Sequence, residues 1–273
     1  MSAFRTRFAP SPTYYLHLGH AASALQVWRR AEEQGGEVLL RIEDIDTTRC
    51  RPEYTSAIYE DLAWLGLRWP QPVRVQSEHF ADYATVVETL TARGLTYRCF
   101  RSRAELATLP DPLRPGAHSA HEEAEYLEAR APFAWRLSLH ACRAALGARW
   151  DALTFIERTA HGLQTRAAEP LKEGDIVLAR KDSPSAYHVA ATHDDALQGV
   201  TDIIRGEDLI DAPHIQTLLQ VLMDWPAPVY EHHPLLLDED GQKLSKRQKS
   251  ISLASLRADG MTADQVRARL GYK

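Results

Sequence analysis

The stretch "FRTRFAPSPTYYLHLGHAASALQVWRRAEEQGGEVLLRIED", residues 4–44, decides the fold. Residues 4–9 predict a short strand that proline ends, and a helical pattern begins at Gly19, with small and apolar side chains recurring on one face. "QGG" at 34–36 ends that helix, and "EVLLRIED" predicts a buried strand that finishes in charged residues. This order of strand, helix and strand is typical of the first unit of a doubly wound parallel sheet. In such a sheet, ligand-binding sites form at the carboxyl ends of the strands.

The rest of the chain continues the alternation of helices and strands. Helical patterns cover 53–66, 79–94 and 211–224, and "VTDIIRG" predicts a strand between the last two of them. From about residue 96 the helix and strand patterns become less regular and the sequence is rich in Pro, Glu and Ala. This predicts an inserted region with less regular secondary structure. The fold class that follows is α/β.

Composition sets the broad class. The 273 residues are 44% hydrophobic, enough for a sizeable core in one large domain or two interleaved ones. A net charge of −5 argues against a generically basic nucleic-acid coat protein. No apolar run approaches the roughly 20 residues that cross a bilayer, and no signal peptide opens the chain, so we expect a cytoplasmic monomer without membrane contact. Cys50, Cys99 and Cys142 are too few and scattered for a disulfide framework.

Two short motifs suggest phosphate chemistry. In "HLGH", His17 and His20 flank Gly19 at a helix start, where backbone N–H groups and the helix dipole attract anions. The alternative is that both histidines simply cap the helix. In "KLSKR", Lys243 and Lys246 are point charges that suit a triphosphate. The alternative is that this motif is a solvated basic turn without a ligand. The two motifs at opposite ends of an α/β core are more specific together than either is alone.

With these motifs the sequence resembles a known family. "RFAPSPT…LHLGH", "RIEDIDTTR", "DDALQGVTDIIRGEDL" and "GQKLSKR" are similar to the catalytic core of class I glutamyl-tRNA synthetases, in the same order. Because the chain ends shortly after the lysine motif, it looks like the truncated glutamyl-Q tRNA(Asp) synthetase paralogues. The resemblance implies a Rossmann-type parallel sheet with an inserted acceptor-binding-like subdomain, a short helical C-terminal tail and no anticodon-binding domain. The expected divisions are 1–95 and 181–235 for the catalytic halves, 96–180 for the insert and 236–273 for the lysine loop and tail.

The same resemblance implies an activity and partners. Members of the paralogue family are ligases that activate L-glutamate with ATP, without needing tRNA, and pass it to the queuosine base of tRNA(Asp). Mg²⁺ would accompany the ATP. Two other interpretations stay open: a non-catalytic tRNA-binding paralogue, and a nucleotidyltransferase that acts on another small acid.

The catalytic and ATP-binding roles map onto the two motifs. His17, His20 and Lys246 are the expected catalytic residues, and Gly19 and Lys243 join them around the ATP. Acyl-adenylate formation depends on positioning and charge stabilisation more than on proton transfer.

Glutamate carries two carboxylates and one ammonium, so its site needs cationic anchors and an anion. The resemblance assigns Glu43 to the ammonium, Arg7 with Tyr187 to the side-chain carboxylate, and Arg205 to the α-carboxylate. Ala9 and Ser11 complete the expected contacts. By residue type alone, the two arginines could equally form surface ion pairs.

Two acidic clusters allow other interpretations. Glu43, Asp44 and Asp46 could bind a metal ion, but Arg41 and Arg49 flank them and favour internal pairing. A second group, His193, Asp194 and Asp195, could form an acid–base set. We favour loop and helix-cap residues near the nucleotide for that group.

The insert departs from the family in its cysteines. Arg101 stands where a second cysteine would follow Cys99, and His118 and His121 leave a zinc site short of its four ligands. We therefore expect no zinc there, and packing must hold the insert together.

Tyr14 is the second departure. The family has glycine after "PSPT", and a tyrosine forced to positive φ there would cost about 1–2 kcal/mol. Either the turn differs or the strain is tolerated, and Tyr14 is a candidate to cover the adenine. Two basic stretches, Arg98–Arg101–Arg103 and Lys246–Arg247–Lys249, are candidates for tRNA contact or solvated faces.

Overall fold

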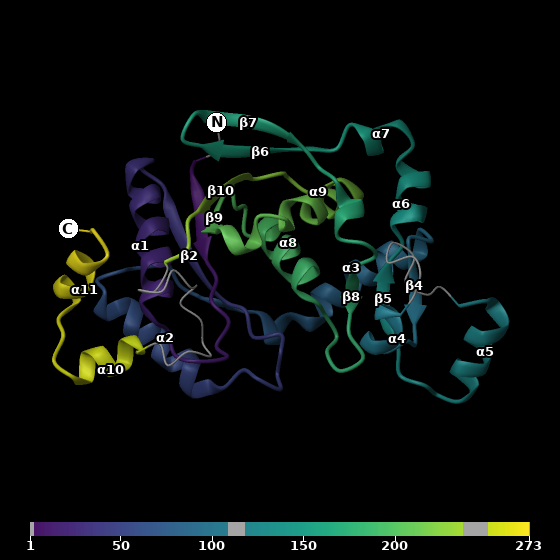
Figure 1. Cartoon of the computed structure of the whole chain (residues 1–273), viewed down its shortest axis with the longest axis horizontal. Helices are drawn as coiled ribbons and strands as arrows, with labels where there is room; N and C mark the ends of the chain where they lie inside the picture. The colour runs from purple at the N-terminus through teal and green to yellow at the C-terminus, as the bar shows by residue number, and fades with distance from the viewer. Residues whose placement is uncertain (1–2, 109–117, 237–250, 273) are drawn as a thin grey trace.

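Two parallel sheets meet at the centre of the computed structural model, which describes residues 3–108, 118–236 and 251–272 (Figure 1). In the first sheet β1 (Arg5–Phe8) pairs with β2 (Glu37–Ile42), which pairs with β3 (Arg74–Val75). The second sheet has the order β7-β6-β10-β9, and only its β6–β7 pair is antiparallel. Its strands are β6 (Thr154–Thr159), β7 (Gly162–Ala167), β9 (Asp202–Gly206) and β10 (Val229–His233).

The two sheets abut where β1 lies beside β9. The backbone N–H of Thr201 donates to the Arg5 carbonyl at 2.8 Å, and the Arg5 N–H donates to the Thr201 hydroxyl at 2.9 Å. The carboxyl ends of β1 and β9 therefore open side by side, at the kind of junction where doubly wound sheets bind ligands. The predicted parallel α/β sheet is confirmed.

Helices cover the sheets and join their strands. α1 and α2 pack against β1 and β2, and the helices predicted over 53–66, 79–94 and 211–224 correspond to α2, α3 and α9. The helices are α1 (Leu18–Glu33), α2 (Pro52–Trp64), α3 (Phe80–Ala92), α4 (Arg103–Ala107), α5 (Ala120–Glu128), α6 (Leu139–Leu146), α7 (Ala148–Asp151), α8 (Tyr187–Leu197), α9 (Ala212–Met223), α10 (Leu253–Ala258) and α11 (Ala263–Arg269). Short 3₁₀ turns are η1 (Gln76–His79), η2 (Pro170–Lys172) and η3 (Glu207–Leu209). Among the described helices, none is long and apolar enough to span a membrane.

A separate antiparallel sheet forms most of the expected insert. It has the order β4-β5-β8, built from β4 (Thr96–Cys99), β5 (Ala134–Leu137) and β8 (Val177–Ala179). Residues 154–167, which also fall in the expected insert of 96–180, instead pair with β10 through β6. This stretch is therefore continuous with the central sheet, a pairing that its local sequence pattern could not reveal.

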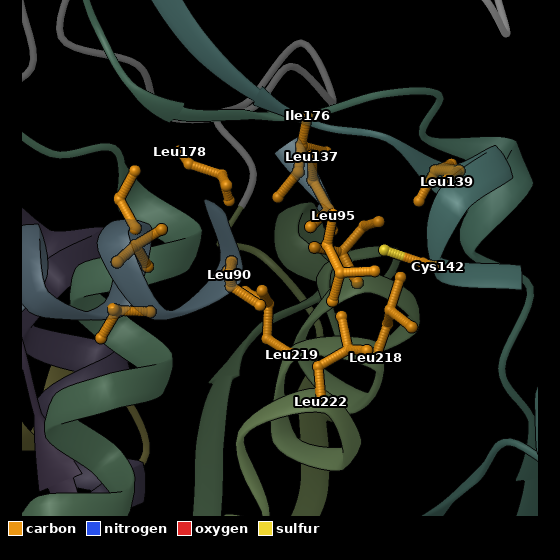
Figure 2. Packing of buried hydrophobic residues seen from close by; sticks show 14 of the residues in the cluster. Leu90, Leu95, Leu137, Leu139, Cys142, Ile176, Leu178, Leu218, Leu219 and Leu222 are labelled. Carbon is orange, nitrogen blue, oxygen red and sulfur yellow. The ribbon is translucent and has the colours of Figure 1, made fainter. Parts of the chain in front are cut away.

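The apolar core has two large clusters. One surrounds α1, β1, β2 and α2 and is closed by α10 and α11 from the C-terminal tail. The other packs α3, α6, α8 and α9 against the antiparallel sheet, with Leu95, Leu137 and Cys142 at its centre (Figure 2). Burial raises the pKa of the Cys142 thiol to about 12, so this cysteine acts as an apolar core residue.

Aromatic packing occupies the part of the insert near Cys99 and His118, where the sequence lacks a full set of zinc ligands. The Phe100 ring stacks on Tyr126 at 4.7 Å between centroids, and His118 stands edge-on to both rings. Arg98 pairs with Glu123 at 2.6 Å and lies over the Trp135 ring, so it helps to pack this region. No group of three or more metal-ligating His, Cys, Asp or Glu side chains occurs among the described residues.

Candidate active site

A cavity of about 560 Å³ opens at the carboxyl ends of β1, β2 and β9, beside the N-terminus of α1. Every predicted site residue in the described ranges lines it, although these residues come from five separate segments. Lys243 and Lys246 lie outside the described residues. The predicted residues in the lining are Arg7, Ala9, Ser11, His17, Gly19, His20, Glu43, Tyr187 and Arg205.

One end of the cavity is the first turn of α1. The Gly19 N–H donates to His17 Nδ1 at 3.1 Å, and the His17 N–H donates to His20 Nδ1 at 3.2 Å. The two imidazoles therefore do cap the helix, as the alternative interpretation held, and they also line the cavity. Since each Nδ1 accepts, the neutral rings carry their proton on Nε2. No acidic side chain lies in the first turn, so the positive end of the helix dipole is not neutralised there.

Gly19 is required by space. A Cβ at this position would lie 2.9 Å from His17 Cε1 and 3.1 Å from His17 Nδ1. A side chain would therefore displace the imidazole that caps the helix. Without a Cβ, Gly19 leaves space at the cavity wall beside the His17 ring.

A serine–histidine pair that the sequence analysis missed also lines this end. The Nδ1 of His233 lies 3.0 Å from the Pro234 carbonyl and must donate to it, which leaves Nε2 as an acceptor. The Ser23 hydroxyl therefore donates to His233 Nε2, at 2.9 Å. These residues are 210 positions apart, and no motif signals them.

The other end of the cavity is built on buried charges. Asp195 Oδ1 accepts from Arg7 Nε at 3.0 Å and from Arg41 Nη1 at 2.8 Å. Arg41 in turn donates to Glu43 Oε1 at 3.0 Å through Nη2 and to Gln198 Oε1 at 3.0 Å through Nη1. Arg41 is completely buried, and Arg7 and Asp195 are 5% and 3% exposed. We call these four charged residues, Arg7, Arg41, Glu43 and Asp195, the charge cluster.

Burial sets the protonation of the charge cluster. It raises the pKa of Glu43 by more than Arg41 and Arg7 lower it. Burial alone would lower the pKa of Arg41, but Asp195 and Glu43 outweigh it and raise that pKa, so Arg41 stays charged. Arg41 is thus a permanent cation between two carboxylates.

Arg205, on β9, lines the same cavity as Arg7 and Glu43. Its Nε donates to His232 Nε2 at 3.3 Å and its Nη1 donates to Tyr187 Oη at 3.4 Å. Burial, followed by Arg205 itself, lowers the pKa of His232 and keeps that ring neutral and able to accept. Nη2 is buried without a partner in the described part of the chain, which leaves a donor for a ligand. Tyr187, expected to act with Arg7 on the side-chain carboxylate, lines the same cavity and accepts this hydrogen bond from Arg205.

The interpretation of Asp194 and Asp195 as loop and helix-cap residues was wrong. Both lie inside α8, and both are buried. Asp194 accepts from Arg74 Nε at 2.8 Å and from the Tyr83 hydroxyl at 2.8 Å, on the side away from the cavity. Two acids can be buried in one turn of α8 because arginines from distant strands form ion pairs with them. The local sequence could not indicate which arginines these are.

The three acids after β2 do not share a site. Glu43 pairs with Arg41, and Asp46 pairs with Arg49 at 2.7 Å, which confirms the expected internal pairing. The Thr48 hydroxyl, together with Arg49, lowers the pKa of Asp46 to about 2. Asp44 accepts from the backbone N–H and the hydroxyl of Ser77, at 2.7 and 2.6 Å. Each of the three carboxylates therefore has its own internal partner, and among the described residues they do not form one metal-binding group.

Tyr14 sits in a turn without strain. Of the described non-glycine residues, only Arg130 and Asp224 have positive φ, so the turn differs from one that needs glycine at Tyr14. Tyr14 does not line the cavity but faces Tyr15 and Tyr54, which removes the support for its covering the adenine.

A parallel sheet with a histidine-capped helix start beside a charged pocket defines the catalytic domain of a class I aminoacyl-tRNA synthetase. Residues 3–270 match the family described as tRNA synthetases class I (E and Q), catalytic domain, and the chain belongs to this family of ligases.

Among its relatives are two glutamyl-Q tRNA(Asp) synthetases. The Rhodobacter capsulatus protein is 38% identical over 97% of this chain and 99% of its own length, and the Nitratidesulfovibrio vulgaris protein is 38% identical over 96% and 83%. The glutamate–tRNA ligase of Parasynechococcus marenigrum is 34% identical over 96% of this chain, which spans 56% of that relative.

Solved structures agree with this fold. A glutamate tRNA ligase from Elizabethkingia meningosepticum, in complex with its amino acid, aligns with a TM-score of 0.71 and 28% identity, over 90% of this chain and 52% of that one. Mycobacterium tuberculosis methionyl-tRNA synthetase bound by methionyl-adenylate aligns at 0.62 and 15% identity, over 99% and 64%, and shows the fold alone.

Proposed function

We propose that this protein activates L-glutamate with ATP and transfers the glutamyl group to the queuosine base of tRNA(Asp). The observation that carries the proposal is that one cavity is lined both by residues of the charge cluster and by the histidine-capped start of α1. Queuosine as the acceptor is supported by the names of the two relatives that match most of their own length.

The charged end suits an amino acid with two carboxylates. The free Nη2 of Arg205 is a donor for one carboxylate, and the Arg7 guanidinium, fixed by Asp195, is the cation for the other. Glu43 supplies the anion for the ammonium group. Ser11 steadies the end of β2 because its hydroxyl donates to the Glu43 carbonyl at 2.7 Å, and Ala9 leaves room beside it.

The other end suits the phosphates of ATP. When the glutamate carboxylate attacks the α-phosphorus and pyrophosphate leaves, negative charge grows in front of the Gly19 backbone and of His17 and His20. The Mg²⁺ that accompanies ATP would be held mainly by phosphate oxygens, since the described residues offer no group of three ligating side chains.

Lys246 and Lys243 would neutralise the triphosphate from the segment between Leu236 and Ile251. Both ends of this segment are attached beside the cavity: Leu236 lines it, Ser252 forms a β-bridge with His17, and the Leu253 N–H donates to the Leu16 carbonyl at 2.8 Å. Six residues of chain separate Lys246 from Ser252, a span of at most about 20 Å. Chain connectivity thus supports the proposal that the lysines act on a nucleotide at His17.

ATP–pyrophosphate exchange tests the first step. We expect exchange that depends on glutamate, proceeds without tRNA, and falls to background with aspartate or glutamine. Absence of exchange with glutamate would contradict the proposal and favour a non-catalytic tRNA-binding paralogue. Exchange with another acid alone would favour a different nucleotidyltransferase.

Transfer of radiolabelled glutamate tests the acceptor. We expect label on tRNA(Asp) that carries queuosine and none on the same tRNA without it. Equal labelling of both preparations would exclude the modified base as the acceptor.

A further inference from the structure

A hollow separate from the cavity lies between the Tyr14–Tyr15 pair and the start of α10. Tyr14 and Tyr15 form one wall, Ile251 and Ser252 lead into the other wall, and the face of α10 completes it. We call this feature the tyrosine hollow. No motif considered above accounts for it.

Three aromatic rings gather at this hollow. Tyr54, from α2, lies 5.8 Å from the Tyr14 ring and 4.9 Å from the Tyr15 ring, centroid to centroid. Tyr14 is 45% exposed and Ile251 is 59% exposed. None of the three tyrosines belongs to a described core cluster, so core packing does not explain why they are grouped.

The tyrosine hollow shares a wall with the active cavity. Ser252, in the hollow, forms a β-bridge with His17, in the cavity, and Tyr15 is two residues before His17. The hollow and the cavity therefore lie on neighbouring parts of the surface.

Positive charge lies beside the rings. The backbone N–H of Arg51 donates to the Pro12 carbonyl at 3.0 Å, which places Arg51 next to the turn that carries Tyr14. Arg51 is exposed and supplies this charge, whereas the nearby Arg49, although its side chain is 70% exposed, is paired with Asp46 at 2.7 Å. The acid in the hollow's lining, Asp259, is on the opposite wall, where its carboxylate could accept from the amino group of a base.

We propose that the tyrosine hollow stacks an unpaired nucleobase of an RNA loop while a neighbouring base enters the cavity. Exposed aromatic rings with arginine at their edge are the arrangement by which proteins hold single-stranded bases and the adjoining phosphates. The inference rests on the proposed function, which supplies the tRNA, and it assigns a role to Tyr14 at a position where a turn needing glycine could not carry a side chain.

The experiment compares two activities of the same variants. For Tyr14→Ala combined with Tyr54→Ala we expect the Kd for tRNA(Asp) carrying queuosine, measured by filter binding, to rise about tenfold. Glutamate-dependent ATP–pyrophosphate exchange without tRNA should stay within about twofold of the wild type. Tyr14→Phe is the matched control, because it keeps the ring, and it should bind tRNA like the wild type. Tyr272→Ala should also leave the Kd unchanged, because Tyr272 contacts Gln26 of α1 and does not line the hollow.

The outcomes separate this inference from the proposed function. If the double variant bound tRNA as tightly as the wild type and kept its exchange activity, the proposed role of the tyrosine hollow would be contradicted, but the proposed function would not. Loss of exchange together with tRNA binding would also contradict that role, because the tyrosines would then only be supporting His17. No exchange in the wild type would contradict the proposed function instead. Arg51→Gln gives an independent measure: the slope of log K against log salt should become shallower by about one unit.

Discussion

The two ends of the cavity are built by different means. At the end proposed for the nucleotide, here called the nucleotide end, the helix cap comes from His17, Gly19 and His20, which are neighbours in sequence. At the end proposed for glutamate, here called the glutamate end, Arg7 and Asp195 are 188 residues apart, and Arg41 and Asp195 are 154 apart. A nucleotide can be held by one helix start, whereas a small amino acid with two carboxylates and one ammonium group needs fixed charges that only tertiary folding brings together.

This difference has an energetic consequence. Buried ion pairs gain little net stability, but removing one partner leaves an uncompensated charge in the interior. Glutamate binding should therefore weaken strongly when one charge of the cluster is removed. At the nucleotide end the contacts are local and partly solvated, so nucleotide binding should weaken only moderately when one contact is removed.

Asp195→Asn should produce the largest effect. Loss of a charge from a buried pair costs about 3–5 kcal/mol, and we expect the glutamate KM to rise roughly 100-fold as Arg7 and Arg41 lose their shared carboxylate. The KM for ATP should stay within about twofold. Both constants come from exchange kinetics with one substrate varied at a time.

Asp194→Asn is the matched control for that variant. Asp194 is the preceding residue on α8, is equally buried and is also paired with an arginine, but it faces Arg74 and Tyr83. We expect a similar fall in melting temperature and a glutamate KM within about threefold of the wild type. Equal rises in glutamate KM for the two variants would mean that only global stability matters.

Gly19→Ala should have an intermediate effect, confined to the nucleotide end. The added Cβ would meet the His17 ring at 2.9 Å and displace it, at a cost of about 1–2 kcal/mol from the lost cap. We expect the KM for ATP to rise about tenfold, with glutamate affinity unchanged in calorimetric titration. A larger change in glutamate affinity than in ATP KM would break the distinction between the two ends.

The pH dependence of glutamate binding should be smaller but diagnostic. Glu43 must be ionised to hold the ammonium group, and burial raises its pKa. As pH falls, protonation of Glu43 should therefore weaken glutamate binding at a pH above the range of an exposed glutamate. In Glu43→Gln, affinity should be low at every pH and should lack this dependence. An identical pH profile in wild type and variant would exclude Glu43 as the titrating group.

Ser23→Ala should have the smallest effect. A neutral hydrogen bond contributes about 0.5–1.5 kcal/mol, so losing the Ser23–His233 contact should raise the KM for ATP by about threefold. Glutamate KM should not change. A value for ATP KM equal to wild type would show that this pair does not order the nucleotide end.

The same difference explains what the sequence could predict. Strand, helix and "HLGH" follow one another along 40 residues, so the first sheet and the helix start could be anticipated from local patterns. Asp195 could not be interpreted correctly, because its partners lie on β1 and β2, and its burial depends on them. Resemblance to the family supplied Arg7 and Arg205, but local sequence could not indicate that Tyr187 contacts Arg205 or that β6 pairs with β10.

The most direct test of whether one cavity binds both glutamate and the nucleotide is co-crystallisation with a glutamyl-adenylate analogue. In this analogue a sulfamoyl group replaces the phosphate. The predicted result is one molecule spanning both ends, with its side-chain carboxylate on Arg7, its acyl carbonyl oxygen on Arg205 Nη2, the ammonium on Glu43 and the sulfamoyl group before Gly19. Density that places the adenosine in another cavity, or leaves Arg205 Nη2 without a contact, would contradict the account.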